Sequence, residues 1–397
     1  MKRIAWWLLA CLIACTDDAA VGVVSDPYDA SVWFDAGMSV AGSLDAGLLD
    51  ASAQDGGQAD GSRTLANVSD ACVGAGMPPL TLDCTGLYAD FPSKTLSQSA
   101  RPYAPAVPLW SDGAEKQRWI MLPPGQKIDV SKPSEWSFPV GTKLFKQFTY
   151  EGKRVETRMF QKLSQNFWVH ATYAWNADDS AAPISYGATV TGGSDGGTWV
   201  IPTSDNCDSC HRGRSDRILG FEQVSLGLAG ATGLTLLKLV VEDLLTPAPS
   251  LVNLRVGDDG TGLAAPALSW LHVNCGVSCH NANENSLGYG SKMDLRLDPT
   301  LLDGAPSTSA WGPIKTTRGV ACVSGSVQGQ PRILPGVDSA SAVVQLITQR
   351  GVLQMPPIAS RVVDMADVAS LVSWIRAMPK SGDAGAGAAD AGVSSDP

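Results

Sequence analysis

Residues 207–211 read Cys-Asp-Ser-Cys-His, and residues 275–280 read Cys-Gly-Val-Ser-Cys-His. The first motif has the spacing of a c-type haem attachment site. Two thiols at this spacing can reach two vinyl groups on one porphyrin edge, and the adjacent imidazole can then bind the iron. We therefore expect thioethers at Cys207 and Cys210 and a proximal ligand in His211. A zinc site would need two more ligands at matching spacing, and a redox dithiol would need a βαβ context.

The second motif contains one residue more than the first. On an α-helix an extra residue turns the first cysteine by about 100° around the axis, although a local bend at Gly276 would restore its reach. We expect a second covalent haem, held by Cys275 and Cys279 with His280 as its proximal ligand. The alternative is a single thioether through Cys279, with Cys275 either free or disulfide-bonded to Cys322.

Residues 354–357 read Gln-Met-Pro-Pro and precede a helix predicted over 364–378. A class I cytochrome c has the same order: a first helix, here begun by residues 268–272, the attachment motif, a Met-Pro loop and a C-terminal helix. Met355 is therefore the predicted distal ligand of the second haem, and its soft, neutral sulfur would raise the reduction potential. The alternative is that Met355 belongs to the hydrophobic core. The long gap before it predicts an insertion within 290–340.

The first motif has no obvious distal ligand. Upstream candidates are Met121, Met159 and His170, and His170 falls on the more polar face of a predicted strand. A five-coordinate first haem is the alternative, and it would be open to peroxide or small ligands. Three arginines follow the motif and either pair with haem propionates or form a solvated loop: Arg212, Arg214 and Arg217.

Strands are predicted before about residue 200. Residues 144–150 and 155–160, joined by a turn at 151–152, are typical of a hairpin. Residues 167–175 alternate in hydrophobicity, which predicts one shared buried face: Phe167, Val169, Ala171, Tyr173 and Trp175. Many aromatic residues in short strands indicate a sandwich or small barrel.

Helices are predicted after about residue 200. Residues 234–245 form an apolar helical run that ends before Pro247, and residues 364–378 repeat apolar side chains at helical spacing, with Asp364 as the N-cap. The fold class is thus α+β, a sandwich-like β-rich domain followed by mainly α-helical haem domains of the cytochrome c type. The expected parts are a β-rich domain at 70–200, a first haem segment at 201–254 and a cytochrome c-like domain at 255–380.

The first fifteen residues have the features of an export signal. Lys2 and Arg3 precede a short apolar run over 4–14. Residues 12–15 (Leu-Ile-Ala-Cys) resemble the lipobox of bacterial lipoproteins, which implies a lipoprotein signal peptide at 1–15 and lipidation of Cys15. An ordinary signal peptide is the alternative. Since Asp does not follow the cysteine, the outer membrane is the expected location.

Two cysteines outside the motifs, Cys72 and Cys84, are close in sequence and are expected to form a disulfide in an exported protein. Residues 16–69 and 381–397 are rich in Asp, Ala and Gly and are predicted to be a disordered linker and a disordered tail. Residues 16–62 contain nine Asp and no Lys or Arg, so much of the formal net charge of −10 belongs to this segment. No basic patch typical of nucleic-acid binding is present.

Several short stretches between residues 100 and 380 resemble an uncharacterised bacterial family of secreted di-haem c-type cytochromes with a β-rich N-terminal region. They include the first motif, Trp199 and the stretches at 108–120, 122–125, 138–142, 156–158, 173–176, 219–222, 274–275, 294–296, 335–336 and 355–357. The resemblance implies two haems and electron transfer, with His211 and His280 as proximal ligands. The chain departs from the family pattern in its six-residue second motif.

These features predict a di-haem c-type cytochrome lipoprotein that transfers electrons in the cell envelope, with a redox protein as partner and a lipid anchor in the membrane. One alternative is a haem-dependent oxidoreductase, peroxidase-like or dehydrogenase-linked, that uses an open first haem. The other is a non-catalytic envelope protein whose β-rich domain binds a ligand and whose haems are structural.

Overall fold

The computed structural model describes residues 72, 77–180, 182–191, 198–250, 252–302, 308–358 and 360–380. The predicted signal peptide with Cys15, the linker at 16–69 and the tail at 381–397 lie outside the described residues. The described residues belong to one compact unit that starts at residue 64. Within them, no helix combines the length and the apolar character needed to cross a membrane.

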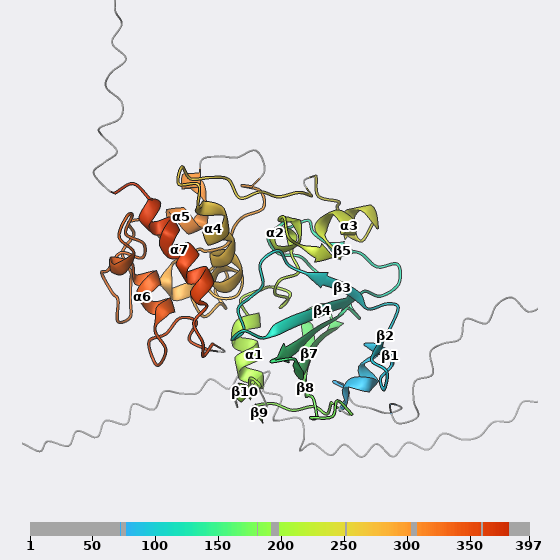
Figure 1. Cartoon of the computed structure of the whole chain (residues 1–397). Helices are drawn as coiled ribbons and strands as arrows, with labels where there is room; N and C mark the ends of the chain where they lie inside the picture. The colour runs from blue at the N-terminus through green and yellow to red at the C-terminus, as the bar shows by residue number, and fades with distance from the viewer. Residues whose placement is uncertain are drawn as a thin grey trace, which may run out of the picture. The chain divides into compact units, whose positions relative to one another are not determined.

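A six-stranded antiparallel sheet is the centre of the first half of the molecule (Figure 1). Its order is β11–β3–β4–β6–β7–β8, and the strands are β11 (Thr232–Gly233), β3 (Arg101–Ala104), β4 (Glu115–Met121), β6 (Lys143–Tyr150), β7 (Lys153–Ser164) and β8 (Phe167–Ala174). The predicted hairpin is confirmed as β6 and β7. Glu151 and Gly152 join them with φ of 48° and 77°, as a two-residue type I′ turn requires.

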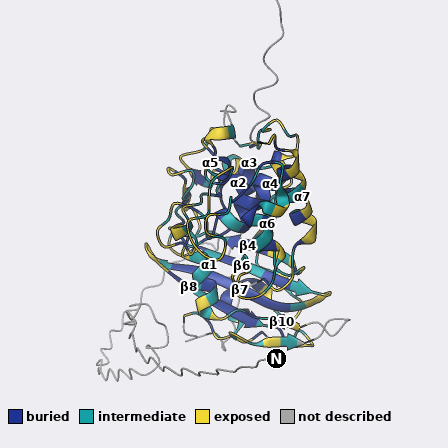
Figure 2. Ribbon diagram, turned by 90° about the vertical axis from the view of Figure 1, so that its left-hand side faces the viewer, coloured by how far each residue is buried: buried dark blue, intermediate teal, exposed yellow. Residues whose placement is uncertain are grey.

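Both faces of this sheet are buried (Figure 2). One face packs Phe145, Met159 and Tyr173 against the segment around residue 82. The opposite face packs other side chains against the helices α2 (Gln223–Gly227) and α3 (Leu236–Val241). The expectation of a single buried face on 167–175 is therefore wrong: Trp168 is buried and Phe167 is exposed. Helices and loops cover this sheet. The described residues contain no second large sheet that could form a sandwich with it.

Segment 201–254 is built into the β-rich part. It contains α1 (Ser204–His211), and its strand β12 (Leu245–Thr246) pairs in parallel with β5 (Ile128–Asp129). The predicted helix over 234–245 is too long, because α3 ends at Val241. Asp243 adopts a φ of 57°, and the N–H of Leu244 donates to the carbonyl of Leu239, which closes the helix.

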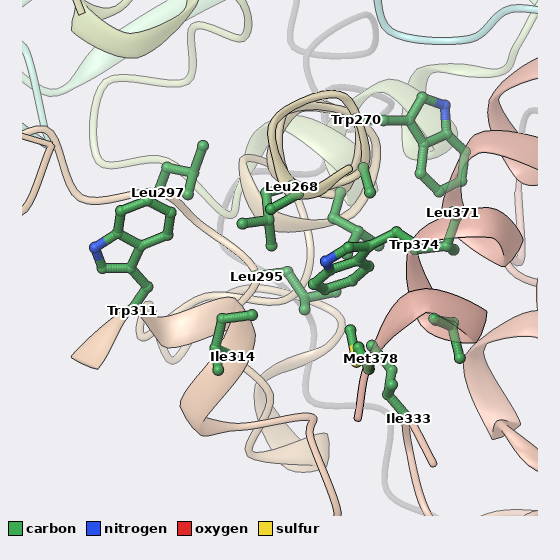
Figure 3. Packing of buried hydrophobic residues seen from close by; sticks show 14 of the residues in the cluster. Leu268, Trp270, Leu295, Leu297, Trp311, Ile314, Ile333, Leu371, Trp374 and Met378 are labelled. Carbon is green, nitrogen blue, oxygen red and sulfur yellow. The ribbon is translucent and has the colours of Figure 1, made fainter. Parts of the chain in front are cut away.

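The second half is formed by short helices around a hydrophobic core that includes Trp270, Trp311 and Trp374 (Figure 3). They are α4 (Ala264–Leu271), the π-helical turn η4 (His272–Gly276), α5 (Gly312–Lys315), α6 (Ala342–Thr348) and α7 (Met365–Ala377). Trp374 and Leu371 of α7 pack with Leu268 of α4 in this core. The predicted C-terminal helix and its N-cap are confirmed, since Asp364 Oδ1 accepts from the N–H of Asp367 at 3.3 Å. The fold is thus α+β.

The remaining regular segments are short. Two further two-stranded pairs and four 3₁₀ turns complete the described elements: β1 (Tyr88–Asp90), β2 (Thr95–Leu96), β9 (Thr189–Thr191), β10 (Thr198–Val200), η3 (Leu82–Thr85), η5 (Tyr289–Ser291), η6 (Thr308–Ala310) and η7 (Asp338–Ala340). The predicted disulfide between Cys72 and Cys84 is confirmed, with Cα atoms 5.3 Å apart.

One buried polar contact joins the segment after the first motif to the helix that leads into the second. His272 is fully buried, and its Nδ1 accepts the N–H of Leu297 at 2.9 Å. Its proton therefore sits on Nε2, which donates to Glu222 Oε1 at 3.2 Å. The same carboxylate accepts the N–H groups of Val224 and Ser225 and so caps α2.

Glu222 remains ionised in this setting. Burial opposes its charge, but the His272 hydrogen bond, the Arg214 charge and the Ser225 hydrogen bond outweigh that effect and hold the pKa of Glu222 well below its usual range. A carboxylate with a lowered pKa stabilises the fold above the unfolded-state pKa, and this contribution is lost as the pH falls toward the folded-state value.

We predict that Glu222→Gln lowers the free energy of unfolding by about 2–4 kcal/mol at pH 7, because an amide cannot accept all three donors. The loss should shrink below about pH 4.3, where the unfolded-state carboxyl becomes protonated. Urea unfolding at several pH values measures both effects. The exposed Glu284 supplies the control, since Glu284→Gln should leave stability unchanged. An equal loss at pH 3 and pH 7 would contradict the assigned charge.

Candidate functional site

Helix α1 carries the first motif on the side that meets the sheet. Thr203 caps the helix by accepting the N–H of Asn206 at 3.3 Å. In an α-helix residues three and four apart share a face, so Cys207, Cys210 and His211 project together. The His211 ring stacks on Phe160 of β7, with ring centroids 4.2 Å apart. Both thiols are free, which leaves them available for thioether bonds.

The His211 imidazole has the tautomer that a metal ligand needs. Its Nδ1–H donates to the carbonyl of Arg217 at 2.5 Å, so the lone pair lies on Nε2. No hydrogen bond to a described residue occupies Nε2. Burial, followed by the charge of Lys146, lowers the pKa of His211 to about 3, so the ring is neutral at pH 7. A backbone carbonyl that fixes the ring in this way is typical of histidines that ligate metals.

The extra residue of the second motif is absorbed by a π-helical turn. Helix α4 widens into η4 at His272, and the N–H of Val277 donates to the carbonyl of His272 at 2.8 Å, five residues back. A π turn takes up one inserted residue while the helix on either side keeps its register. The expected bend at Gly276 is thus a widened turn that ends at Gly276.

The widened turn restores the backbone relation between the first cysteine and the histidine. In α1 the helical hydrogen bonds join the N–H of His211 to the carbonyl of Cys207. In the second motif the N–H of His280 donates to the carbonyl of Cys275 at 2.8 Å. The additional residue therefore does not turn Cys275 away from the site. Cys275 and Cys322 are both free, so the alternative disulfide between them is absent.

The His280 imidazole has the same tautomer as His211. Ser291 Oγ lies 3.0 Å from His280 Nδ1, and its single proton goes to the carbonyl of Gly288 at 2.6 Å. The hydroxyl oxygen must therefore accept the proton of Nδ1, which leaves the lone pair on Nε2. Burial, and after it the charge of Arg332, lowers the pKa of His280 to about 4.

The two motifs lie against each other. Gly213, two residues after the first motif, packs so closely on Ser278 that a Cβ atom would overlap the Ser278 carbonyl oxygen. Burial, and after it the nearby Cys279 thiol, raises the pKa of the Cys210 thiol to about 12. Burial raises the pKa of the Cys279 thiol, and the charge of Arg212 from the first motif's segment partly opposes that rise. The four motif cysteines and two histidines thus form one continuous site.

The two remaining histidines differ from this pair. His272 has both ring nitrogens engaged, as described above, and cannot serve as a ligand. His170 lies on the α1 side of the sheet, with Nε2 3.4 Å from Ser204 Oγ and 3.7 Å from Asp208 Oδ1. The upstream candidates Met121 and Met159 pack on the opposite face of the sheet. His170 is thus the only one of the three named upstream candidates on the side of the first motif.

Met355 lies half-buried at the margin of the core that contains α4 and α7. Its backbone N–H donates to the carbonyl of Leu346 at 2.9 Å. The side chain of Gln354 bonds the carbonyls of Pro356 and Ser360 and shapes the loop. Ligation of the second iron by Met355 stays a prediction.

Two of the three arginines after the first motif already have carboxylate neighbours. Arg217 pairs with Asp208 at 2.8 Å, and the buried Arg214 lies 3.6 Å from Glu135. Glu135 also pairs with Arg296, which follows the second motif. These contacts tie the segments after both motifs to one loop of the β-rich part.

The ligand geometry argues against zinc at either motif. In the described part of the chain only one group of three metal-binding side chains converges, that of Cys72, Asp83 and Cys84, and its thiols form the disulfide. A hollow of about 480 Å³ at the end of the sheet, beside Gln147 and Trp175, is lined by no thiol and no imidazole. Paired thiols beside a neutral imidazole with a free Nε2 fit a covalently bound porphyrin.

Several residues of the site belong to no sequence motif and were not predicted. Gly213 and Gly288 leave room for the neighbouring motif backbone, and Ser291 orients His280. Asn281 Nδ2 donates to the carbonyl of Gly276 at 2.8 Å and secures the π turn. Of these four residues, only Gly213 could have been noticed in the sequence, because it follows the Cys210-His211 pair by two residues.

Comparison with protein-family models, with curated proteins and with solved structures found no match to this chain.

We predict that Gly288→Ala displaces His280, because a Cβ atom would lie 2.7 Å from both His280 Nδ1 and the Cys279 carbonyl oxygen. Gly213→Ala should separate the two motifs. Each change should lower the free energy of unfolding by about 3 kcal/mol, the upper range for overpacking. Urea unfolding measures the loss. Gly290→Ala is the matched control, since its Cβ atom would meet nothing within 4 Å.

Proposed function

We propose that the chain is a di-haem c-type cytochrome that transfers electrons in the cell envelope. One observation carries this proposal: both motifs present free thiols and an imidazole whose Nδ1 proton is held by an oxygen acceptor, with Nε2 left for a metal. Sequence spacing alone does not require this tautomer. A histidine with another role in the same fold, His272, has the opposite one.

Each motif supplies a complete proximal half-site. Cys207 and Cys210 would hold one haem and His211 would bind its iron, while Cys275, Cys279 and His280 would do the same for the second. The bound iron would supply reversible one-electron chemistry. The chain's own residues fix the imidazole orientation, through the carbonyl of Arg217 and the hydroxyl of Ser291.

The contact between the motifs supports electron transfer between the two groups. Gly213 packs on the backbone of Ser278, and the Cys279 thiol is near enough to raise the pKa of the Cys210 thiol. Attachment sites in contact favour a shared redox role over two independent ones. The second iron, with Met355 as its distal ligand, would be the higher-potential end.

The disulfide between Cys72 and Cys84 supports an oxidising compartment. This agrees with an exported lipoprotein anchored through Cys15, and an envelope redox protein would be its partner. A second candidate function, a haem-dependent oxidoreductase, is favoured by one observation: His170 is occupied with Ser204 and Asp208. Carbon monoxide binding by one reduced haem of two would select that candidate.

We predict two covalent haems per chain in protein exported with the c-type maturation machinery, measured as pyridine haemochrome against protein mass. The double variant Cys207→Ser, Cys210→Ser should retain one, because the second motif keeps its own thiols. Cys322→Ser, which alters a cysteine outside both motifs, should retain two. A parent protein without a Soret band would refute the proposed function, and one with a single haem would refute the second site.

We predict that deletion of Val277 preserves the second haem. The deletion turns the motif into Cys-Gly-Ser-Cys-His, and the π turn should close to an α turn with the same cysteine-to-histidine relation. Insertion of one glycine between Asp208 and Ser209 is the converse test. Helix α1 is regular along the motif, so the insertion should reduce attachment at the first site. Mass spectrometry of the haem-bearing peptides distinguishes the sites, and loss of the second haem on deletion would contradict the role of the π turn.

A further inference from the structure

A row of cationic side chains crosses the sheet on the face next to the first motif. Arg118 of β4, Lys146 of β6 and Arg158 of β7 are register partners, so they lie side by side across three strands. Lys116 lies two residues from Arg118 in β4 and points to the same face. Four basic side chains are thus gathered on one largely buried surface.

Only one member of this row has a counter-ion within the described chain. Arg158 binds Glu156 through two hydrogen bonds of 2.9 and 2.6 Å. Glu156 is fully buried and also accepts the indole N–H of Trp199 at 3.0 Å. This carboxylate is therefore fully used.

None of the other three basic side chains forms an ion pair with a described residue, although the charges of Asp112 and Asp364 partly oppose the lowering of the Lys116 pKa. Arg118 is only 6% exposed, and neither Arg118 nor Lys146 makes a hydrogen bond or an ion pair with any residue that the structure describes. Lys116 bonds only the carbonyl of Leu109 and the hydroxyl of Ser111. Burial, followed by the Arg118 and Arg158 charges, lowers the pKa of Lys116 to about 7. Buried charges of one sign without partners are costly, so this surface is suited to an anion.

Nearby acidic residues are committed elsewhere. Asp216 binds Lys162 and the indole of Trp168, while Asp208 pairs with Arg217. Glu135 binds Arg296. The anion for the row must therefore come from outside these acidic groups.

The row adjoins the first motif. Phe160, which stacks on the His211 ring, follows Arg158 by two residues on the same face of β7. Arg158 and Lys146 are close enough to the thiols of Cys207 and Cys210 that their charges partly oppose the rise in thiol pKa caused by burial. From Arg158 the row continues across two strand spacings, about 10 Å, to Arg118. This span is comparable with the breadth of a porphyrin.

We propose that Arg118 and Lys146 bind the propionate carboxylates of the haem attached at Cys207 and Cys210. The proposal rests on the proposed function. The proposal replaces the expectation that the arginines after the motif bind the propionates. Arg214 and Arg217 already have carboxylate neighbours. Lys116 adds positive potential at the same place.

The test compares Arg118→Gln and Lys146→Gln with the parent holoprotein. Lys153→Gln, at an exposed position of β7, is the matched control, and Lys146→Arg keeps the charge. Soret-excited resonance Raman spectra report the propionate bending bands, and a redox titration reports the potential of the first haem. Nitrite titration of the Soret band serves as the probe for a free oxyanion.

Both glutamine variants should shift the propionate bands and favour the oxidised iron by roughly tenfold at fixed potential, the effect of one charge at about 10 Å in a protein-like dielectric. Lys153→Gln and Lys146→Arg should match the parent. Unchanged bands and potential in both glutamine variants would overturn the proposal, as would a Lys146→Arg protein that behaves like Lys146→Gln. Weakened nitrite binding with unchanged propionate bands would assign the row to a free oxyanion and also overturn it. A parent without haem would instead overturn the proposed function.

Discussion

The buried contact between Glu222 and His272 holds the site together. It joins α2, which follows the first motif, to the π turn that precedes the second. The carboxylate satisfies three donors in the interior, where an unpaired charge would be costly. The same two segments of the chain also meet where Gly213 packs on Ser278.

Three histidines of this chain adopt two different tautomers because their ring nitrogens meet different hydrogen-bond partners. His211 and His280 give their Nδ1 proton to an oxygen, so Nε2 is left for a metal. His272 receives a backbone N–H on Nδ1 and gives its Nε2 proton to a carboxylate. The distinction comes from single hydrogen bonds with residues 6, 11 and 25 positions away in sequence. No local pattern in the sequence reveals it.

Much of the local structure could be predicted, and most of the packing could not. The β6–β7 hairpin, the N-capped helix α7 and the Cys72–Cys84 disulfide depend on residues close in sequence, so local rules sufficed. The burial of Trp168 depends on helices more than fifty residues away, and alternation on one strand carries no information about them. The cationic row at Arg118 and Lys146 is equally hidden, because register partners become neighbours only once the strands pair.

The π turn at His272–Gly276 bears on how attachment sites are counted from sequence. A search for the fixed five-residue pattern finds one match in this chain, because three residues instead of two separate Cys275 from Cys279. In both motifs a backbone hydrogen bond joins the N–H of the histidine to the carbonyl of the first cysteine. A helix can close the ring that this bond completes at two sizes, α or π. Counted by these rings, the chain has two candidate sites.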